Sequence, residues 1–130
     1  MDYLQLAASA VETVQRTGGY AAEAYVLDAK SLTIEVANQN VDTLKFAEDT
    51  GIGLRIISAN GTVGFAYSTN LDDIEDLAKR AINNGNNTFQ DKYNVLPKFS
   101  NSIFNMNLID EKIAKTSVEE KIDLAKDLEQ

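Results

Sequence analysis

The chain of 130 residues contains no cysteine, no histidine and no tryptophan, and only one proline. Without cysteine it cannot form a disulfide, a thiolate metal site or a thiol nucleophile. Without histidine a Ser-His-Asp or Cys-His catalytic arrangement is impossible, and zinc sites are built almost always from His and Cys. We therefore predict no catalytic, cofactor-binding or metal-binding residue in this chain; carboxylates, Lys, Tyr, Ser and Thr are its only acid–base or nucleophilic groups.

Positive charge is also scarce, because 12 Lys and Arg face 20 Asp and Glu, for a net charge of −8. Proteins that bind DNA need basic surfaces to neutralise phosphates, so we expect no direct nucleic-acid partner. The N-terminus has no basic segment followed by an apolar core, and no apolar run approaches the roughly 20 residues that span a bilayer. We expect no membrane partner and a cytoplasmic location.

Apolar residues at helical spacing predict three helices. The first covers residues 2–16 and ends at Gly18-Gly19. The second has Thr69 or Asn70 as its N-cap and Gly85 as its stop. The third begins at the capping box Ser117-Val118-Glu119-Glu120 and reaches Gln130 without a stop signal, so we expect it to be truncated.

Alternating apolar and polar residues predict about five strands, separated by turns rich in Asn, Asp, Ser and Gly. Together with the helices they predict an α+β fold: a largely antiparallel sheet with the first two helices packed on one face. Two short strand pieces are expected in the polar segment that follows the second helix. The strands lie near residues 22–26, 32–36, 41–46, 51–57 and 62–68, the turns at 28–31, 38–40, 48–50 and 58–61, and the short pieces at 95–96 and 103–106.

Arg55 is a lone charge in an apolar strand, and its side chain points to the face opposite Leu54 and Ile56. It is either exposed on the open face or paired with a carboxylate such as Glu35 or Glu48, or it is an anchor for a substrate or partner segment.

Gly51 and Gly53 do not form a dinucleotide-binding fingerprint, because the third glycine is missing and the segment enters a strand. They indicate instead a bend or a close approach of another chain segment. Asn60-Gly61 is typical of a tight turn, because both residue types tolerate positive φ.

The block from Glu48 to Ile57, then Asn60-Gly61-Thr62-Val63-Gly64-Phe65-Ala66 and the helix that follows, resembles the amino-terminal domain of the TldD/PmbA family. Members are often named modulators of DNA gyrase. The order of the other elements fits that domain, so the resemblance covers essentially the whole chain. It implies a family domain over residues 1–90, then a linker and the start of the next helical segment over 91–130. It makes Gly51, Gly53, Asn60, Gly61 and Gly64 structural motif residues and leaves Arg55 as the candidate substrate or interface residue.

The resemblance implies a zinc metallopeptidase whose histidine-bearing motif lies in a carboxyl-terminal part that this chain lacks. Zinc is expected there and not here, and whether the parent subunit is itself an enzyme stays open, because some family subunits lack the motif. The implied partners are unfolded peptide and a second family subunit, in a homo- or heterodimer. Any effect on gyrase would be indirect, through proteolysis.

Two other functions remain open. The chain could be a free-standing adaptor or regulator that binds a protein partner, in which case the reading frame would stop at Gln130. It could also be a hydrolase that uses carboxylates alone, which glycoside and ester substrates would test.

Overall fold

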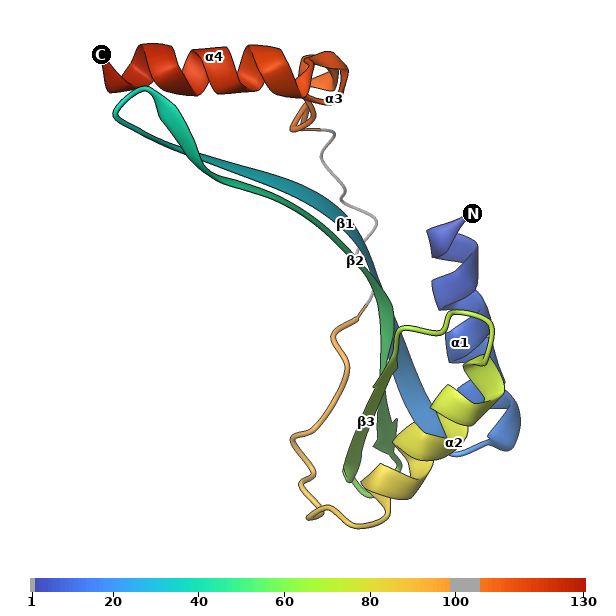
Figure 1. Ribbon diagram of the computed structural model, residues 1–130. Coiled ribbons are helices and arrows are strands. Elements are labelled where there is room, and N and C mark those ends of the chain that lie inside the picture. Colours follow the sequence, from blue (N-terminus) through green and yellow to red (C-terminus); the bar gives the residue numbers. More distant parts are fainter. Residues whose placement is uncertain (1, 99–105) are drawn as a thin grey trace. The chain divides into compact units, whose positions relative to one another are not determined.

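The computed structural model describes residues 2–98 and 106–130, with the elements labelled in Figure 1. The chain divides into two compact units: unit 1 contains residues 1–29 and 49–98, and unit 2 contains residues 30–48 and 99–130. The long strands β1 and β2 contribute to both. In chain order the elements are α1 (Tyr3–Thr17), β1 (Tyr20–Ala37), β2 (Asn40–Ser58), β3 (Val63–Ser68), α2 (Ile74–Gly85), α3 (Glu111–Lys115) and α4 (Val118–Glu129).

The α+β fold is as predicted, but the sheet has three strands in the order β1–β2–β3, and the prediction of about five was wrong. The predicted turns at 28–31 and 48–50 lie inside β1 and β2, so four predicted strands merge into two. The predicted short strand at 95–96 is irregular, and residues 103–105 of the other lie outside the described residues.

The supposed turn residues are strand residues that bond across the β1–β2 ribbon. Lys30 Nζ lies 2.9 Å from Glu48 Oε1. Thr50 donates a 3.3 Å hydrogen bond to Asp28. Opposite charges and hydroxyl–carboxylate pairs stabilise neighbouring strands, so polar residues here continue the sheet instead of ending it.

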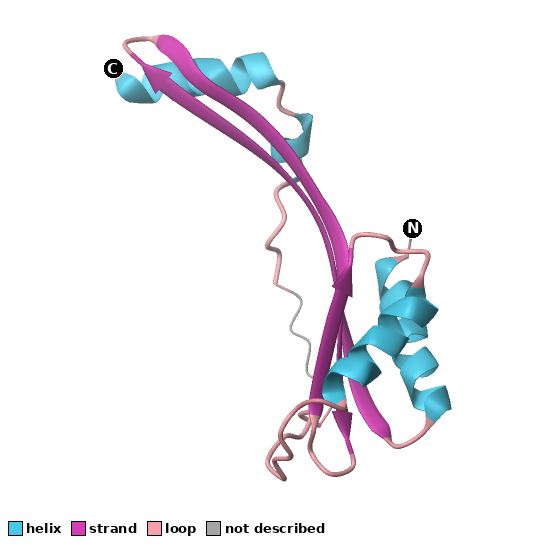
Figure 2. Cartoon of the chain, turned by 60° about the horizontal axis from the view of Figure 1, so that its bottom comes forward, coloured by secondary structure: helices cyan, strands magenta, loops and turns pink. Residues whose placement is uncertain are grey.

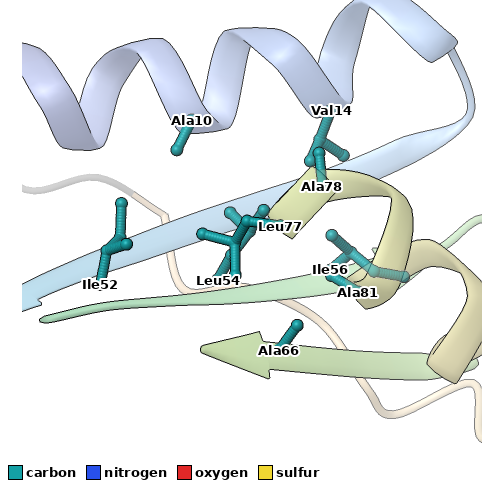
Figure 3. Close-up of a cluster of buried hydrophobic side chains, with 9 residues drawn as sticks. All are labelled: Ala10, Val14, Ile52, Leu54, Ile56, Ala66, Leu77, Ala78 and Ala81. Carbon is teal, nitrogen blue, oxygen red and sulfur yellow. The ribbon is translucent and has the colours of Figure 1, made fainter. Parts of the chain in front are cut away.

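Unit 1 holds a single hydrophobic core between the sheet and two helices. Helices α1 and α2 lie on one face of the sheet, as predicted (Figure 2). Their apolar stripes meet the alternate, inward-facing residues of β2 and β3 (Figure 3). The core residues are Ala10, Val14, Ile52, Leu54, Ile56, Ala66, Leu77, Ala78 and Ala81.

The first turns of α1 and α2 are capped by aspartates. Asp2 accepts hydrogen bonds from the backbone of α1, which therefore starts one residue later than predicted. The predicted cap of α2 at Thr69 or Asn70 was wrong, because Asp73 caps it by accepting from the Asp76 N–H. Asn70 instead accepts from the Asp72 N–H in the preceding turn.

Unit 2 consists of the outer half of the β1–β2 hairpin with α3 and α4. The capping box of Ser117 and Glu120 is formed, as predicted. None of the described residues of this unit is buried. Helix α3 was not predicted. No helix in the described part of the chain is both long enough and apolar enough to cross a bilayer.

Candidate functional site

The side of the sheet opposite α1 and α2 in unit 1, here called the open face, carries three exposed aromatic rings. Tyr25 of β1 is 71% exposed, and Phe65 and Tyr67 of β3 are 53% and 70% exposed. The Phe65 and Tyr67 ring centroids lie 6.5 Å apart at a tilt of 31°. Aromatic side chains with a polar tip are typical of binding surfaces, because they offer large contact area together with a hydrogen-bonding group.

A hollow of about 420 Å³ on the open face is lined by residues of all three strands. Gly53 forms part of its floor, and the Phe65 ring leans over it: a Cβ added at Gly53 would lie 3.2 Å from two ring atoms. The close approach expected at Gly53 is therefore that of an aromatic ring from the adjacent strand. Covering of a strand glycine by a cross-strand ring is a known stabilising arrangement.

Arg55 lies beside this hollow and forms an ion pair with Glu23, at 2.6 Å between Nη2 and Oε1. The partner is on β1 and is neither Glu35 nor Glu48, because β1 is continuous and its residue 23, not 35, comes beside this part of β2. The two side chains are 44% and 47% exposed. The pair is therefore open to solvent and available to a ligand.

Two further motif glycines allow close backbone approaches. At Gly64, an added Cβ would lie 2.0 Å from the Ala81 carbonyl oxygen and 2.6 Å from the Gly85 nitrogen, so only glycine lets α2 pack this closely on β3. At Gly61, φ is +82° and an added Cβ would meet the Asp91 carbonyl oxygen at 2.0 Å. Sequence alone suggested Gly85 as a helix stop but not its contact with Gly64.

The Asn60-Gly61 turn is formed, with the Gly61 N–H donating to the Ser58 carbonyl at 3.0 Å. Gly61 has positive φ, whereas Asn60 does not. Gly51 meets the Ser68 carbonyl, with an added Cβ 3.2 Å from its oxygen. The motif residues therefore shape the β2–β3 hairpin and its contacts.

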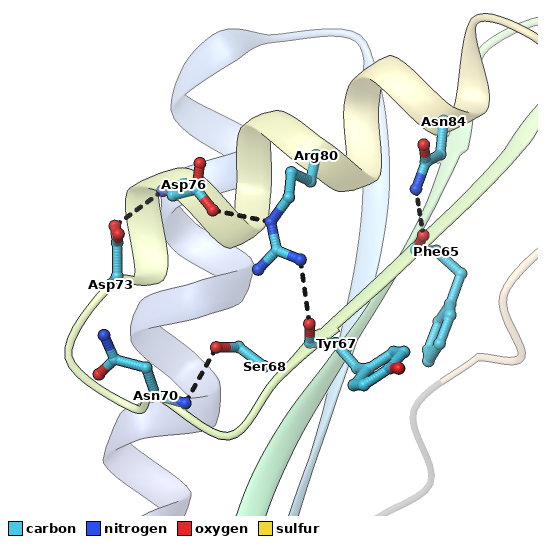
Figure 4. Close-up of polar contacts among 8 residues, drawn as sticks. All are labelled: Phe65, Tyr67, Ser68, Asn70, Asp73, Asp76, Arg80 and Asn84. Carbon is cyan, nitrogen blue, oxygen red and sulfur yellow. Dashed lines mark hydrogen bonds and ion pairs between the residues drawn. The ribbon is translucent and has the colours of Figure 1, made fainter.

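Side chains of α2 close part of the outer edge of β3 (Figure 4). The pairing of Ile56 with Gly64 and Leu54 with Ala66 turns the backbone groups of the intervening β3 residues outward. Arg80 donates to the Tyr67 carbonyl at 3.2 Å, and Asn84 donates to the Phe65 carbonyl at 2.8 Å.

Thr88, which follows α2, makes the third contact with the outer edge of β3, at Val63. Its hydroxyl accepts from the Val63 N–H at 3.1 Å and lies 2.9 Å from the Val63 carbonyl. Arg80, Asn84 and Thr88, here called the edge ladder, are spaced by four residues, which matches the spacing of two residues along a strand. The four-residue spacing can be read from the sequence, but the β3 carbonyls to which these side chains bind cannot.

In unit 1 the outer edge of β1, unlike that of β3, is not closed by side chains of described residues. Along residues 20–29 no described residue hydrogen-bonds to the backbone groups that point away from β2. A strand edge of this kind is a template for pairing with another extended segment. The described residues contain no group of three or more His, Cys, Asp or Glu side chains that could hold a metal ion.

Comparisons with known proteins agree with this geometry. Residues 22–85 match the family model for PmbA/TldA metallopeptidase domain 1. No curated protein matches the chain.

A crystal structure from Thermotoga maritima, described as a "putative modulator of a DNA gyrase", is similar over 95% of this chain, with a TM-score of 0.79 and 18% sequence identity. At this identity the similarity shows the fold, and the chain spans 28% of the length of that protein. The matched residues contain β2, β3, α2 and all of β1 except its first two residues, and thus the open face and two of the three edge-ladder residues, Arg80 and Asn84. Residues 22–85 of the chain therefore carry the amino-terminal domain of the TldD/PmbA family.

Proposed function

We propose that this chain is the non-catalytic amino-terminal domain of a TldD/PmbA-type metallopeptidase, and that its sheet contributes to the cleft for an unfolded peptide or to the interface with a second subunit. The observation that carries the proposal is the open face, where exposed rings surround the Arg55–Glu23 pair within the family domain. With no histidine or cysteine in the sequence, the zinc ion and the proteolytic step belong to another part of the protein.

The two sheet edges support a specific mode of peptide contact. The edge ladder occupies the backbone groups of β3, so an added strand would have to displace Arg80, Asn84 and Thr88. The β1 edge over residues 20–29 has no such cover among the described residues. An extended peptide would pair there through its main chain, which provides affinity without requiring a particular sequence.

Arg55 would act by orienting the peptide or the partner. A guanidinium group offers five donors in a planar fork and binds carboxylates and carbonyls at the same time. Because Glu23 uses only part of this capacity and both groups are about half exposed, a ligand acceptor can share Arg55 without breaking the pair.

The test uses the protein in which this domain is joined to the zinc-bearing part. In Arg55→Ala, peptide turnover should fall while the circular dichroism spectrum and melting temperature stay close to those of the parent. Arg16→Ala is a matched control, since Arg16 lies on α1 and, among the described residues, its guanidinium hydrogen-bonds only to Thr13 of the same helix. Unchanged turnover in Arg55→Ala would remove Arg55 from the site.

A reading frame that ends at Gln130 would favour the adaptor function instead, whereas one that continues into a segment with paired histidines would favour the peptidase. The remaining parts of the proposal are a homo- or heterodimer of family subunits, a cytoplasmic location, and no direct contact with nucleic acid or membrane. The acidic net charge of −8 supports the last of these.

A further inference from the structure

The tip of the β1–β2 hairpin, in unit 2, has the geometry of an anion-binding site. Asn38 and Gln39 join the strands and both have left-handed backbone angles, with φ of 52° and 63°. In a two-residue turn of this kind the strand ladder does not use the N–H groups of the two central residues. Successive N–H groups that converge in this way form a concave site for an anion.

A carboxylate of the same chain fills this site. Glu129 at the end of α4 accepts from the Asn38 N–H and from the Gln39 N–H, each at 2.7 Å, with one oxygen for each donor. The Gln39 side-chain amide adds a 3.1 Å hydrogen bond to Glu129 and a 2.9 Å hydrogen bond to the Lys126 carbonyl. Hence three donors of the hairpin tip converge on one carboxylate.

Glu129 lies in the last turn of α4, where the helix itself does not favour a negative charge. A negative charge in the last turn of a helix is unfavourable, because that end of the helix carries partial negative charge. Unit 2 also has no buried residue among those described, so no hydrophobic core forces α4 into place. The hydrogen bonds at the tip therefore fix the position of the last turn of α4 on the hairpin.

An apolar groove of about 1580 Å³ lies between the hairpin and helices α3 and α4 of unit 2. Leu128, the residue next to Glu129, lines it, as do Leu44 and Phe46 of β2. Three lysines and two carboxylates line it as well, so the groove has an excess of one positive charge in a chain whose net charge is −8. Lys121 is the lysine for which no described carboxylate lies within ion-pair distance.

We propose that the hairpin tip is a binding site for the C-terminal carboxylate of an apolar peptide, occupied in this chain by Glu129. The peptide carboxylate would take the place of Glu129 on the Asn38 and Gln39 N–H groups, and the apolar side chains of the peptide would lie in the adjacent groove. Backbone sites of this type are an established means of capturing a peptide C-terminus. The proposal rests on the geometry of unit 2 and does not depend on the peptidase assignment.

The test is a titration of the whole chain followed through the backbone amide signals of Asn38 and Gln39 by NMR. The probe is N-acetyl-Leu-Leu with a free carboxylate, and the comparison ligands are its C-terminal amide and acetate. In Glu129→Ala the free acid should shift both signals and bind at least about tenfold more tightly than to the parent chain, because the tethered competitor is gone. The amide should shift neither signal, and acetate should bind more weakly than the peptide acid.

Two further variants keep the test decisive. Asp127→Ala removes the same charge from the same helix turn but no contact at the tip, so it should behave like the parent. Glu129→Gln keeps one acceptor oxygen and should fall between the parent and Glu129→Ala, which guards against a general loss of structure in the alanine variant. Unchanged amide signals from residues 52–57 would show that unit 1 is intact in every variant.

Equal shifts with the acid and the amide, or no shift in Glu129→Ala, would overturn the proposed carboxylate site. Equal affinity for acetate and the peptide acid would overturn the part of the proposal that concerns the groove.

Discussion

Units 1 and 2 use the same two strands but differ in how they bury apolar side chains. Every buried residue among those described belongs to unit 1. In unit 2, Leu44 and Phe46 are 54% and 63% exposed, although they are separated from the buried Leu54 by even numbers of residues along β2. Alternation along a strand therefore defines a face, but packed helices decide whether that face becomes a core.

The reason for the difference lies in the helices. In unit 1, α1 and α2 place small residues such as Ala10, Ala78 and Ala81 against the sheet, so the helix backbones come close and exclude water. In unit 2 the half-buried side of α4 carries Lys121 and Lys126 beside Ile122 and Ala125. Long charged side chains on that side leave less apolar surface for packing, and α4 also contacts the hairpin tip through the hydrogen bonds of Glu129.

Among these variants, Leu54→Ala in unit 1 should cause the largest loss of stability. Leu54 is fully buried, so its truncation should lower the free energy of unfolding by about 2–5 kcal/mol. The matched change in unit 2 is Leu124→Ala, at a residue that is 59% exposed, and it should cost about 1 kcal/mol or less. Urea denaturation followed by circular dichroism measures both, and similar losses would show that unit 2 contains a core of its own.

Gly64→Ala should have the next largest effect. The new Cβ would lie 2.0 Å from the Ala81 carbonyl oxygen, so α2 must move away from β3 at a cost of roughly 1–3 kcal/mol. Gly53→Ala is the control, because its Cβ would meet only the Phe65 ring at 3.2 Å, and that ring can turn outward. Thermal unfolding compares the two, and the prediction fails if the Gly53 variant melts at the lower temperature.

Asn84→Ala should open the closed edge of unit 1 with a smaller loss of stability. It removes the 2.8 Å hydrogen bond to the Phe65 carbonyl, which is worth about 1 kcal/mol. The exposed edge should also promote pairing between copies, which sedimentation velocity would detect as association that increases with concentration. Asn83→Ala on the same helix turn is the control and should remain like the parent; equal association in both variants would argue against the edge ladder as a barrier.

The smallest effect on stability is expected for Arg55→Ala. The Arg55–Glu23 pair is about half exposed, and solvent screening limits such pairs to about 0–1 kcal/mol. A double-mutant cycle with Glu23→Ala measures the coupling directly. A coupling well above that range would mean that the pair stabilises unit 1, and the loss of turnover proposed for Arg55→Ala would then have a structural cause.

Local signals predicted the helices better than the strands. The Ser117 cap and the Gly85 stop are each set by a few adjacent residues, and α1 and α4 begin within a residue or two of the predicted positions. The start of α2 was placed three to four residues too early, because both Asn70 and Asp73 can accept a backbone hydrogen bond.

The number of strands could not be read correctly, because polar clusters such as Asp28–Ser31 occur in turns and equally in exposed ribbons. Their cross-strand contacts, Lys30 with Glu48 and Thr50 with Asp28, join residues 18 to 22 positions apart in the sequence.

The residues of the candidate site could likewise be predicted only in part from the sequence. The sequence identified Arg55 and the motif glycines, because each of these residue types stands out in an apolar strand. The partner of Arg55, the Phe65 ring over Gly53 and the edge ladder all depend on which residues of other elements come close.

Composition alone determined that this chain contains no imidazole or thiol for zinc, and short-range patterning indicated α1, α2, α4, the β2–β3 hairpin turn and the family motif. In the described part of the chain, tertiary structure decided that the sheet has three strands, that one of its edges is closed and the other open, and that Glu129 fills the hairpin tip. The physical reason is the range of the interactions. Caps, turns and periodicity involve residues a few positions apart, whereas Glu129 bonds to a turn 90 residues away.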